Sequence, residues 1–296
     1  MCADFQSWIA AHQMRFEEAL RSLLPRADIA PQRLHEAMRY AVLDGGKRVR
    51  PLLAFAASEL VGAEVARVNV AAAAVELIHA YSLVHDDMPC MDDDVLRRGK
   101  PTCHVQYDEA TALLVGDSLQ TLAFQLLAEH RLNDDPAHQL EMVKLLAMAS
   151  GSRGMAGGQA IDLSSVGKSL TLPELEFMHI HKTGALIRAA VLLGARCGAV
   201  SAAQMERLDR FGKLIGLAFQ VVDDVLDCEA DTATLGKTAG KDADNGKPTY
   251  VSLLGVEGAR DMARRLHRES LEALDGLGES AKRLRELADF ILLRKF

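Results

Sequence analysis

The stretch VNVAAAAVELIHAYSLVHDDM, residues 68–88, decides the fold class, because it is one long apolar segment that ends in two aspartates. Its alanines and leucines favour a helix, and proline appears only after it, at Pro89. Strand-favouring runs are scarce elsewhere, so the sequence predicts an all-α protein. The same periodicity predicts helices at 1–20, 33–43, 51–60, 107–128, 136–150, 173–200 and 203–228, with shorter ones from 250 to about 293.

Two linkers between these helices are long and polar: LRRGKPTCH at 96–104 and ATLGKTAGKDADNGKPTY at 233–250. A long polar loop in a compact protein is more often a functional lid than a plain connector. The chain shows no 20–50-residue repeat and no break in composition. We therefore expect one domain, residues 1–296, of about ten helices.

Composition excludes several classes of protein. The formal net charge of −7 argues against a general nucleic-acid binder, which needs excess lysine and arginine. Five scattered cysteines without a CxxC pair argue against disulfides or zinc and favour a reducing, cytoplasmic location. The N-terminus lacks the pattern of a signal peptide, and no stretch approaches ~18 uncharged apolar residues, so we expect no membrane span.

The segment FQVVDDVLD, residues 219–227, carries two carboxylates at helical spacing. Asp223 and Asp227 are four apart, so on a helix both point to one side. Like charges at this spacing repel, and the neighbouring residues are apolar, so a cation is needed to offset the cost. Oxygen ligands of this kind indicate magnesium.

A second acidic segment, DDMPCMDDD, spans residues 86–94. Asp86 and Asp92 are six apart and would not share a face of a regular helix. Pro89 between them lets the chain bulge, so that Asp92 can return toward Asp86. Magnesium binds one or two carboxylates together with substrate phosphates, so two facing clusters predict a clamp for a diphosphate.

Basic residues accompany both acidic segments. The string GGKRVRP, residues 45–51, places three cations at a helix N-terminus, which is itself an anion site. Two arginines follow the first acidic segment, and three lysines lie in the loop after the second. These residues are Lys47, Arg48, Arg50, Arg97, Arg98, Lys237, Lys241 and Lys247.

Six strings, in one order over essentially the whole chain, resemble the trans-isoprenyl diphosphate synthases, specifically the bacterial farnesyl type. They are GGKRVRP, LIHAYSLVHDDMPCMDDDVLRRGKPTCH, GMAGGQAIDL, HKTGALI, FQVVDDVLD and GKTAGKDADNGKPTY. The resemblance implies an all-α isoprenoid synthase fold of about ten main helices around a deep central cavity, usually in a homodimer. One departure is Val95, where relatives often continue the aspartate run.

The resemblance also implies roles for individual residues. A cluster of three magnesium ions would be held by Asp86, Asp87, Asp92, Asp223 and Asp227. The allylic diphosphate would be contacted by Arg97, Lys182 and Lys237, and Lys241 would be a further substrate-binding residue. Isopentenyl diphosphate would be bound by Gly46, Lys47, Arg50, His79 and Arg98. Thr183 and Gln220 match polar residues near the reacting carbons.

The reaction implied is ionisation, condensation and elimination, which joins isopentenyl diphosphate to dimethylallyl and then geranyl diphosphate. Residues just before Asp86 would form the floor of the cavity that the growing chain fills. These are Ser82 and Tyr81, about 6–7.5 Å from Asp86 along a helix axis. A bulky Tyr81 resembles the farnesyl-forming floor, and geranyl or geranylgeranyl diphosphate synthase is the alternative within the family.

Three rival functions are weaker. A di-iron helical-bundle oxidase would use the two ExxH strings, Glu76 to His79 and Glu176 to His179, but it leaves the aspartates unexplained. A non-catalytic partner subunit would lack one acidic motif. A terpene cyclase would need a different second motif from DDVLD and would not need the cations at 47 and 50.

Overall fold

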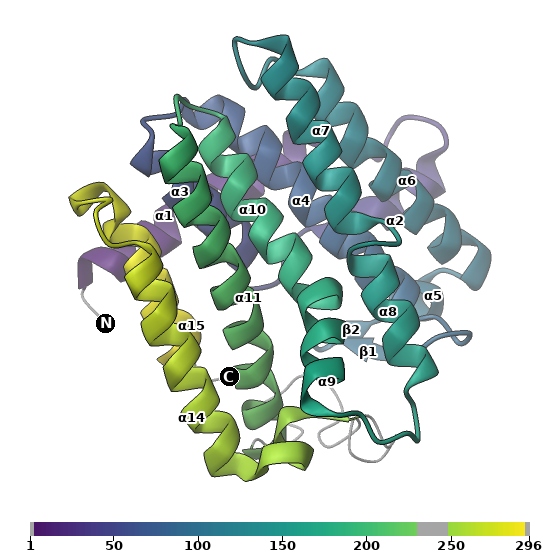
Figure 1. The fold of residues 1–296 in the computed structure, drawn as a ribbon. Coiled ribbons are helices and arrows are strands. Elements are labelled where there is room, and N and C mark those ends of the chain that lie inside the picture. The colour runs from purple at the N-terminus through teal and green to yellow at the C-terminus, as the bar shows by residue number, and fades with distance from the viewer. Residues whose placement is uncertain (1–2, 230–247, 294–296) are drawn as a thin grey trace.

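The computed structural model describes residues 3–229 and 248–293, which are almost entirely helical (Figure 1). The elements in chain order are α1 Ala3–Leu23, α2 Gln32–Val42, α3 Val49–Leu60, α4 Val65–Asp86, β1 Leu96–Arg97, β2 Lys100–Pro101, α5 Cys103–Gln106, α6 Glu109–Glu129, α7 Pro136–Ser150, α8 Met155–Ser164, α9 Leu172–His179, η1 Ile180–Gly184, α10 Ala185–Arg196, α11 Ala202–Glu229, α14 Tyr250–Ala273, η2 Glu279–Ala281 and α15 Lys282–Leu293. The all-α prediction is confirmed.

Three predicted features differ from the structure. The expected helix 173–200 is divided into α9 and α10 by η1, a segment of π-helix. The linker after the first acidic segment forms a small hairpin, in which Arg97 pairs with Lys100. The glycine-rich stretch after α7 continues into α8, a helix that the sequence did not predict because its glycines hide the helical pattern.

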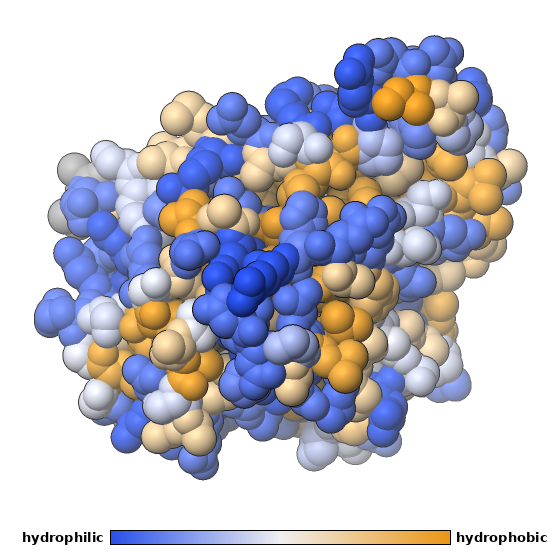
Figure 2. Space-filling view, turned by 90° about the horizontal axis from the view of Figure 1, so that it is seen from above, coloured by the Kyte–Doolittle hydropathy of each residue, from blue (hydrophilic) through white to orange (hydrophobic). Residues whose placement is uncertain are grey.

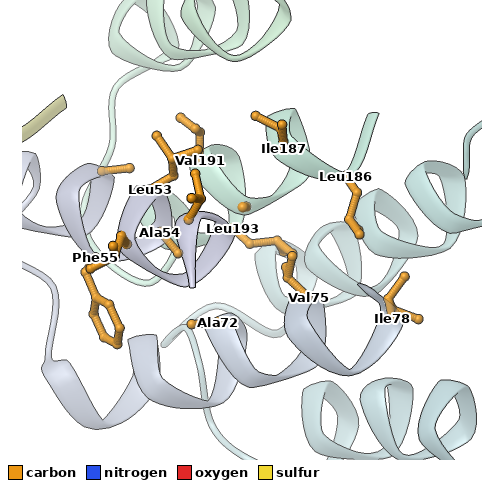
Figure 3. Close-up of a cluster of buried hydrophobic side chains, with 14 of the residues drawn as sticks. Leu53, Ala54, Phe55, Ala72, Val75, Ile78, Leu186, Ile187, Val191 and Leu193 are labelled. Atoms are coloured by element: carbon orange, nitrogen blue, oxygen red, sulfur yellow. The ribbon is translucent and has the colours of Figure 1, made fainter. Parts of the chain in front are cut away.

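The core is centred on α3, α4 and α10, whose apolar side chains interlock in Figure 3. Leu53 of α3, Val75 of α4 and Val191 of α10 are fully buried there. At Gly194 the backbones of α10 and α3 come so close that a Cβ would lie 2.1 Å from the carbonyl oxygen of Ala54. The absence of a side chain at this glycine therefore sets the distance between the two helices.

Around this core, α11 lies beside α10 and carries α14 and α15 on its other side, while α6 packs along α4 (Figure 1). Helix α8 contacts η1. The C-terminal end of α4, the middle of α8 and the π-helical segment η1 therefore surround one region of the molecule, and the cavity described below lies there.

Two helices are long and apolar enough to cross a membrane by length and composition, although the sequence analysis expected none. In α4, 72% of the most apolar 18-residue window is buried inside the bundle, as is typical of a core helix. In α6 only 39% of that window is buried. Helix α6 leaves the apolar side chains of Leu113 and Leu114 exposed in the described chain.

Candidate active site

A cavity of about 350 Å³ lies between α4, α8 and η1. It is lined by side chains from segments that are far apart in the sequence, and many of them are residues that the sequence analysis selected. The selected lining residues are Arg50, His79, Tyr81, Ser82, Asp86, Lys182 and Thr183. The fold therefore brings a predicted metal ligand, predicted diphosphate ligands and the predicted cavity floor to one place.

The first acidic segment bends back after α4 ends. The backbone N–H of Asp92 donates to the carbonyl of Asp86 at 2.8 Å, and that of Asp94 donates to Asp87 at 3.1 Å. The predicted bulge around Pro89 is thus present. Burial raises the pKa of Asp86 to about 6, although nearby Lys182 lowers it, and the charge of Asp92 raises it further. A cation placed between these carboxylates would relieve this cost.

Asp87 pairs with Arg97 of the hairpin. Its carboxylate is buried and accepts hydrogen bonds from Nε of Arg97 at 2.8 and 2.9 Å, and from a terminal nitrogen of the same guanidinium at 2.5 Å. Burial raises the pKa of Asp87, and Arg97 partly offsets that effect. Both carboxylate oxygens therefore accept from Arg97, and the metal-ligand role of Asp87 stays a prediction.

The second acidic segment stays regular on α11. Gln220, Asp223 and Asp227 are spaced i, i+3 and i+7, so they lie along one face of the helix. Gln220 is hydrogen bonded to Thr183, which lines the cavity, with 3.1 Å between the two oxygens. The face that carries the two predicted metal ligands is therefore the face that meets the cavity wall.

Lys182 is held by α8. Its ammonium group donates to the buried carboxylate of Asp162 at 2.5 Å. Helix α8 approaches η1 closely at Gly158, where a Cβ would lie 2.1 Å from the backbone nitrogen of Lys182. The sequence analysis missed Asp162 and the cavity-lining Gln159, although the polar spacing of GQAID within an apolar string could have indicated them.

Two of the residues predicted to bind isopentenyl diphosphate, Gly46 and His79, lie near a third, Arg98. Its guanidinium carbon would lie 2.8 Å from a Cβ at Gly46, whose φ of +87° also favours glycine. His79 lies near Arg50 and Arg98, and burial together with these cations lowers its pKa well below the usual range. His79 is therefore neutral at pH 7, and the local positive charge comes from the arginines.

Arg48 is a correction to the predicted basic cluster. It has a left-handed backbone with a φ of +53°, and its side chain is buried. It pairs with Glu76 of α4 at 2.8 Å and with Glu17 of α1 at 2.9 Å. It therefore ties three helices together and does not join the anion site. Lys237, Lys241 and Lys247 lie outside the described residues.

The di-iron alternative loses its main support in this structure. Glu76, the first residue of one ExxH string, is occupied by Arg48. Within residues 3–229 and 248–293, no group of three or more His, Cys, Asp or Glu side chains is arranged to hold a metal by protein ligands alone. A diphosphate-bridged magnesium site does not require such a group, because substrate phosphates and water complete the coordination.

Tyr81 is fixed at the cavity wall from the α6 side. Its hydroxyl is hydrogen bonded to the side chain of Gln120, and burial raises its pKa. His85 lies edge-on to the Tyr81 ring, with 5.8 Å between ring centroids. The imidazole of His85 occupies the space left by Gly116 and contacts the carbonyl of Leu113 at 3.1 Å. His85 thus packs between the Tyr81 ring and α6.

Comparison with known proteins agrees with this geometry. The polyprenyl synthetase family matches residues 31–287. The chain belongs to this family. It is 47% identical to the farnesyl diphosphate synthase of Escherichia coli K12, over 98% of this chain and 99% of that protein. The family resemblance inferred from the sequence strings is confirmed.

Two solved structures share the fold over nearly the whole chain. One is an FPP/GFPP synthase from Zymomonas mobilis, with a TM-score of 0.90, 40% identity, and coverage of 98% of this chain and 100% of that one. The other is a geranyltransferase from Helicobacter pylori complexed with magnesium and isoprenyl diphosphate. It has a TM-score of 0.84 and 35% identity, with coverage of 99% of this chain and 97% of that one.

Proposed function

We propose that this protein is a short-chain prenyltransferase that condenses isopentenyl diphosphate with dimethylallyl and then geranyl diphosphate to form farnesyl diphosphate. The observation that carries this proposal is the cavity. Its wall joins a half-buried aspartate, Asp86, a lysine, Lys182, and a bulky floor residue, Tyr81. The high identity to farnesyl diphosphate synthases over nearly the full length supports the same activity.

The aspartates fit magnesium. Asp86 is a hard oxygen ligand whose pKa is raised to about 6 by burial, and Asp92 returns next to it. We assign Asp86, Asp92, Asp223 and Asp227 as ligands of up to three ions, and Asp87 as the residue that holds Arg97. Bound magnesium supplies Lewis-acid stabilisation of the departing diphosphate.

The chain's own residues position the substrates and stabilise charge. Lys182 and Arg97 contact the allylic diphosphate as its C–O bond breaks and the electron pair leaves on oxygen. Thr183 and Gln220 face the resulting allylic cation. The π electrons of isopentenyl diphosphate, held by the group around Arg50 and Arg98, form the new carbon–carbon bond. A proton is then lost to the diphosphate. The lysines at 237 and 241 are assigned to the allylic diphosphate by resemblance only.

Product length is assigned to the floor beneath Asp86. Tyr81 lines the cavity there, and its bulky ring limits the room for a growing chain. This favours a fifteen-carbon product. A longer product remains the second candidate, because the similar Zymomonas mobilis protein is described as an FPP/GFPP synthase.

We also propose that the chain is one domain that acts as a soluble, cytoplasmic homodimer. Helix α6 leaves Leu113 and Leu114 about half exposed, and neighbouring Val105 of α5 is 50% exposed. Apolar patches are visible between hydrophilic side chains in Figure 2. A second copy seated on the α5–α6 face would cover this area, which sedimentation analysis would detect.

The proposed function is tested by incubating the protein with isopentenyl diphosphate, magnesium, and dimethylallyl, geranyl or farnesyl diphosphate, and then sizing the products by chromatography. We expect farnesyl diphosphate from the first two allylic substrates and little extension of the third. The absence of condensation with every pair would overturn the proposal. Extension of farnesyl diphosphate would move the assignment to a longer-chain synthase.

A further inference from the structure

A chain of hydrogen bonds leads from the cavity wall into the protein interior. Thr183, which lines the cavity, lies with its hydroxyl 3.1 Å from the side-chain oxygen of Gln220. The amide nitrogen of Gln220 donates to one carboxylate oxygen of Asp224 at 2.9 Å. The other carboxylate oxygen accepts the backbone N–H of Tyr250 at 2.8 Å. Asp224 is 8% exposed, and Tyr250 is fully buried.

The carboxylate at the end of this chain dictates the direction of every bond in it. A carboxylate can only accept, so the group of Gln220 that faces Asp224 must be its NH₂. The carbonyl oxygen of Gln220 therefore faces Thr183, and because that oxygen also can only accept, Thr183 must donate its proton to it. The lone pairs of the Thr183 oxygen are left for the cavity.

We propose that Asp224 is a positioning residue that orients the carbonyl of Gln220 and the lone pairs of Thr183 toward the allylic cation. This inference rests on the proposed function. A developing positive charge is stabilised by the negative ends of dipoles that are already in place. If the Gln220 amide were turned over, it would present N–H groups, which oppose that charge.

Asp224 thereby has a different task from Asp223 beside it. Its carboxylate binds two nitrogens of the protein, one on its own helix and one at the first residue of α14. The bond from Tyr250 holds Asp224 from outside α11. Tyr250 itself is packed against His179, with 5.3 Å between the ring centroids. The direction of the chain is consequently built into the fold and does not depend on bound substrate.

The test compares Asp224→Asn with the double variant Asp224→Asn/Gln220→Glu. In the single variant the new asparagine still accepts from Tyr250 through its oxygen, but its NH₂ now confronts the NH₂ of Gln220 and favours turning that amide. In the double variant the asparagine NH₂ donates to the new glutamate, whose other oxygen again accepts from Thr183. The double variant restores the acceptor toward Thr183 with unchanged net charge.

We expect Asp224→Asn to lower kcat by about 10- to 100-fold, with the KM for both diphosphates changed less than about threefold. The double variant should recover most of the loss. Far-UV circular dichroism and thermal melting check that both fold. If the single variant does not fold, the double variant still carries the test, because a folded double variant without activity would contradict the inference.

Several outcomes would overturn the inference. The first is an unchanged kcat in Asp224→Asn. The second is a change in KM as large as the fall in kcat, with both following the loss of thermal stability. The third is a double variant that folds but recovers no activity. The wild-type assay separates these outcomes from failure of the proposed function. A wild-type protein that forms no condensation product overturns both, whereas an active wild type beside an unimpaired Asp224→Asn overturns only the role of Asp224.

Discussion

The two acidic segments have similar strings but different local structures. In the first, the chain leaves α4 at Asp86 and returns through a bend, so that the ligands assigned to magnesium are six residues apart. In the second, Asp223 and Asp227 remain four apart on the uninterrupted helix α11. A bent segment and a regular helix can thus direct their carboxylates to the same metal–diphosphate site. This requires that the surrounding fold bring the two segments together.

Each segment also turns its second aspartate inward. Asp87 accepts from Arg97 of the hairpin, whereas Asp224 accepts from Gln220 and from the start of α14. The carboxylate of Asp87 accepts from a guanidinium, and that of Asp224 accepts from two amide nitrogens. We propose that each DD pair combines one outward residue for metal with one inward residue for positioning.

The largest effect is expected at the outward aspartates. Asp86→Ala and Asp223→Ala should each lower turnover by about a thousandfold or more, because each removes a metal ligand that stabilises the departing diphosphate. The condensation assay measures turnover, and far-UV circular dichroism should show unchanged helicity. Substantial activity in either variant would contradict its assignment as a ligand.

The inward aspartate of the first segment should have a smaller effect. Asp87→Asn should reduce turnover by about 10- to 100-fold, because it weakens the hold on Arg97 without removing a metal ligand. Asp94→Asn is the matched control, since the Asp94 carboxylate is 3.8 Å from the same guanidinium. A loss at Asp87 as large as that at Asp86 would return Asp87 to the set of metal ligands.

Magnesium affinity should depend on pH through the first segment. The pKa of Asp86 is about 6 in the folded protein, so protons compete with the metal and affinity should fall about tenfold per pH unit below pH 6. In the metal-free protein, the stability of the fold changes with pH in the opposite direction. The folded pKa lies above the unfolded value, so Asp86 stabilises the fold below pH 3.8, and that contribution is lost as pH rises through 6.

Titration calorimetry between pH 5 and 7.5 measures the first effect. The difference in thermal stability between wild type and Asp86→Asn, followed over the same range without metal, isolates the second. A magnesium affinity that is constant from pH 5 to 7.5 would show that Asp86 is already ionised throughout this range. The raised pKa of Asp86 would then not distinguish the first segment from the second.

The smallest effect on rate is expected for substitutions of Tyr81, five residues before Asp86. Tyr81 stands there on α4, whereas the corresponding place on α11 is held by the small, buried Ala218. Tyr81→Ala should lengthen the products beyond fifteen carbons, because it opens the cavity floor, while turnover changes only a few-fold. Tyr81→Phe keeps the volume, loses the bond to Gln120, and should still give fifteen carbons.

Chromatography of the products distinguishes these results. A Tyr81→Ala variant that still makes only the fifteen-carbon diphosphate would show that the floor lies elsewhere. A shift in Tyr81→Phe would show that the hydroxyl and its bond to Gln120 set product length, and not the bulk of the ring.

Much of the fold and site could be predicted from the chain. The helix 136–150 has the predicted bounds, and the bend between Asp86 and Asp92 follows from Pro89. The division of the helix 173–200 could not be predicted, because a π-helical segment leaves the apolar pattern almost unchanged. Arg48 was misassigned because periodicity does not reveal a left-handed backbone, which turns this side chain inward.

Local chemistry thus determined the helices and the two acidic segments, because helical period, proline and charge spacing act over a few residues. The placement of Asp86 near Lys182, and the contact of Thr183 with Gln220, joins residues nearly a hundred and about forty positions apart. Those contacts, and the inward turn of Asp87 and Asp224, depend on how α4, α8, η1 and α11 pack. Long-range packing alone distinguishes the outward aspartate of each pair from the inward one, since both are the same residue in the same string.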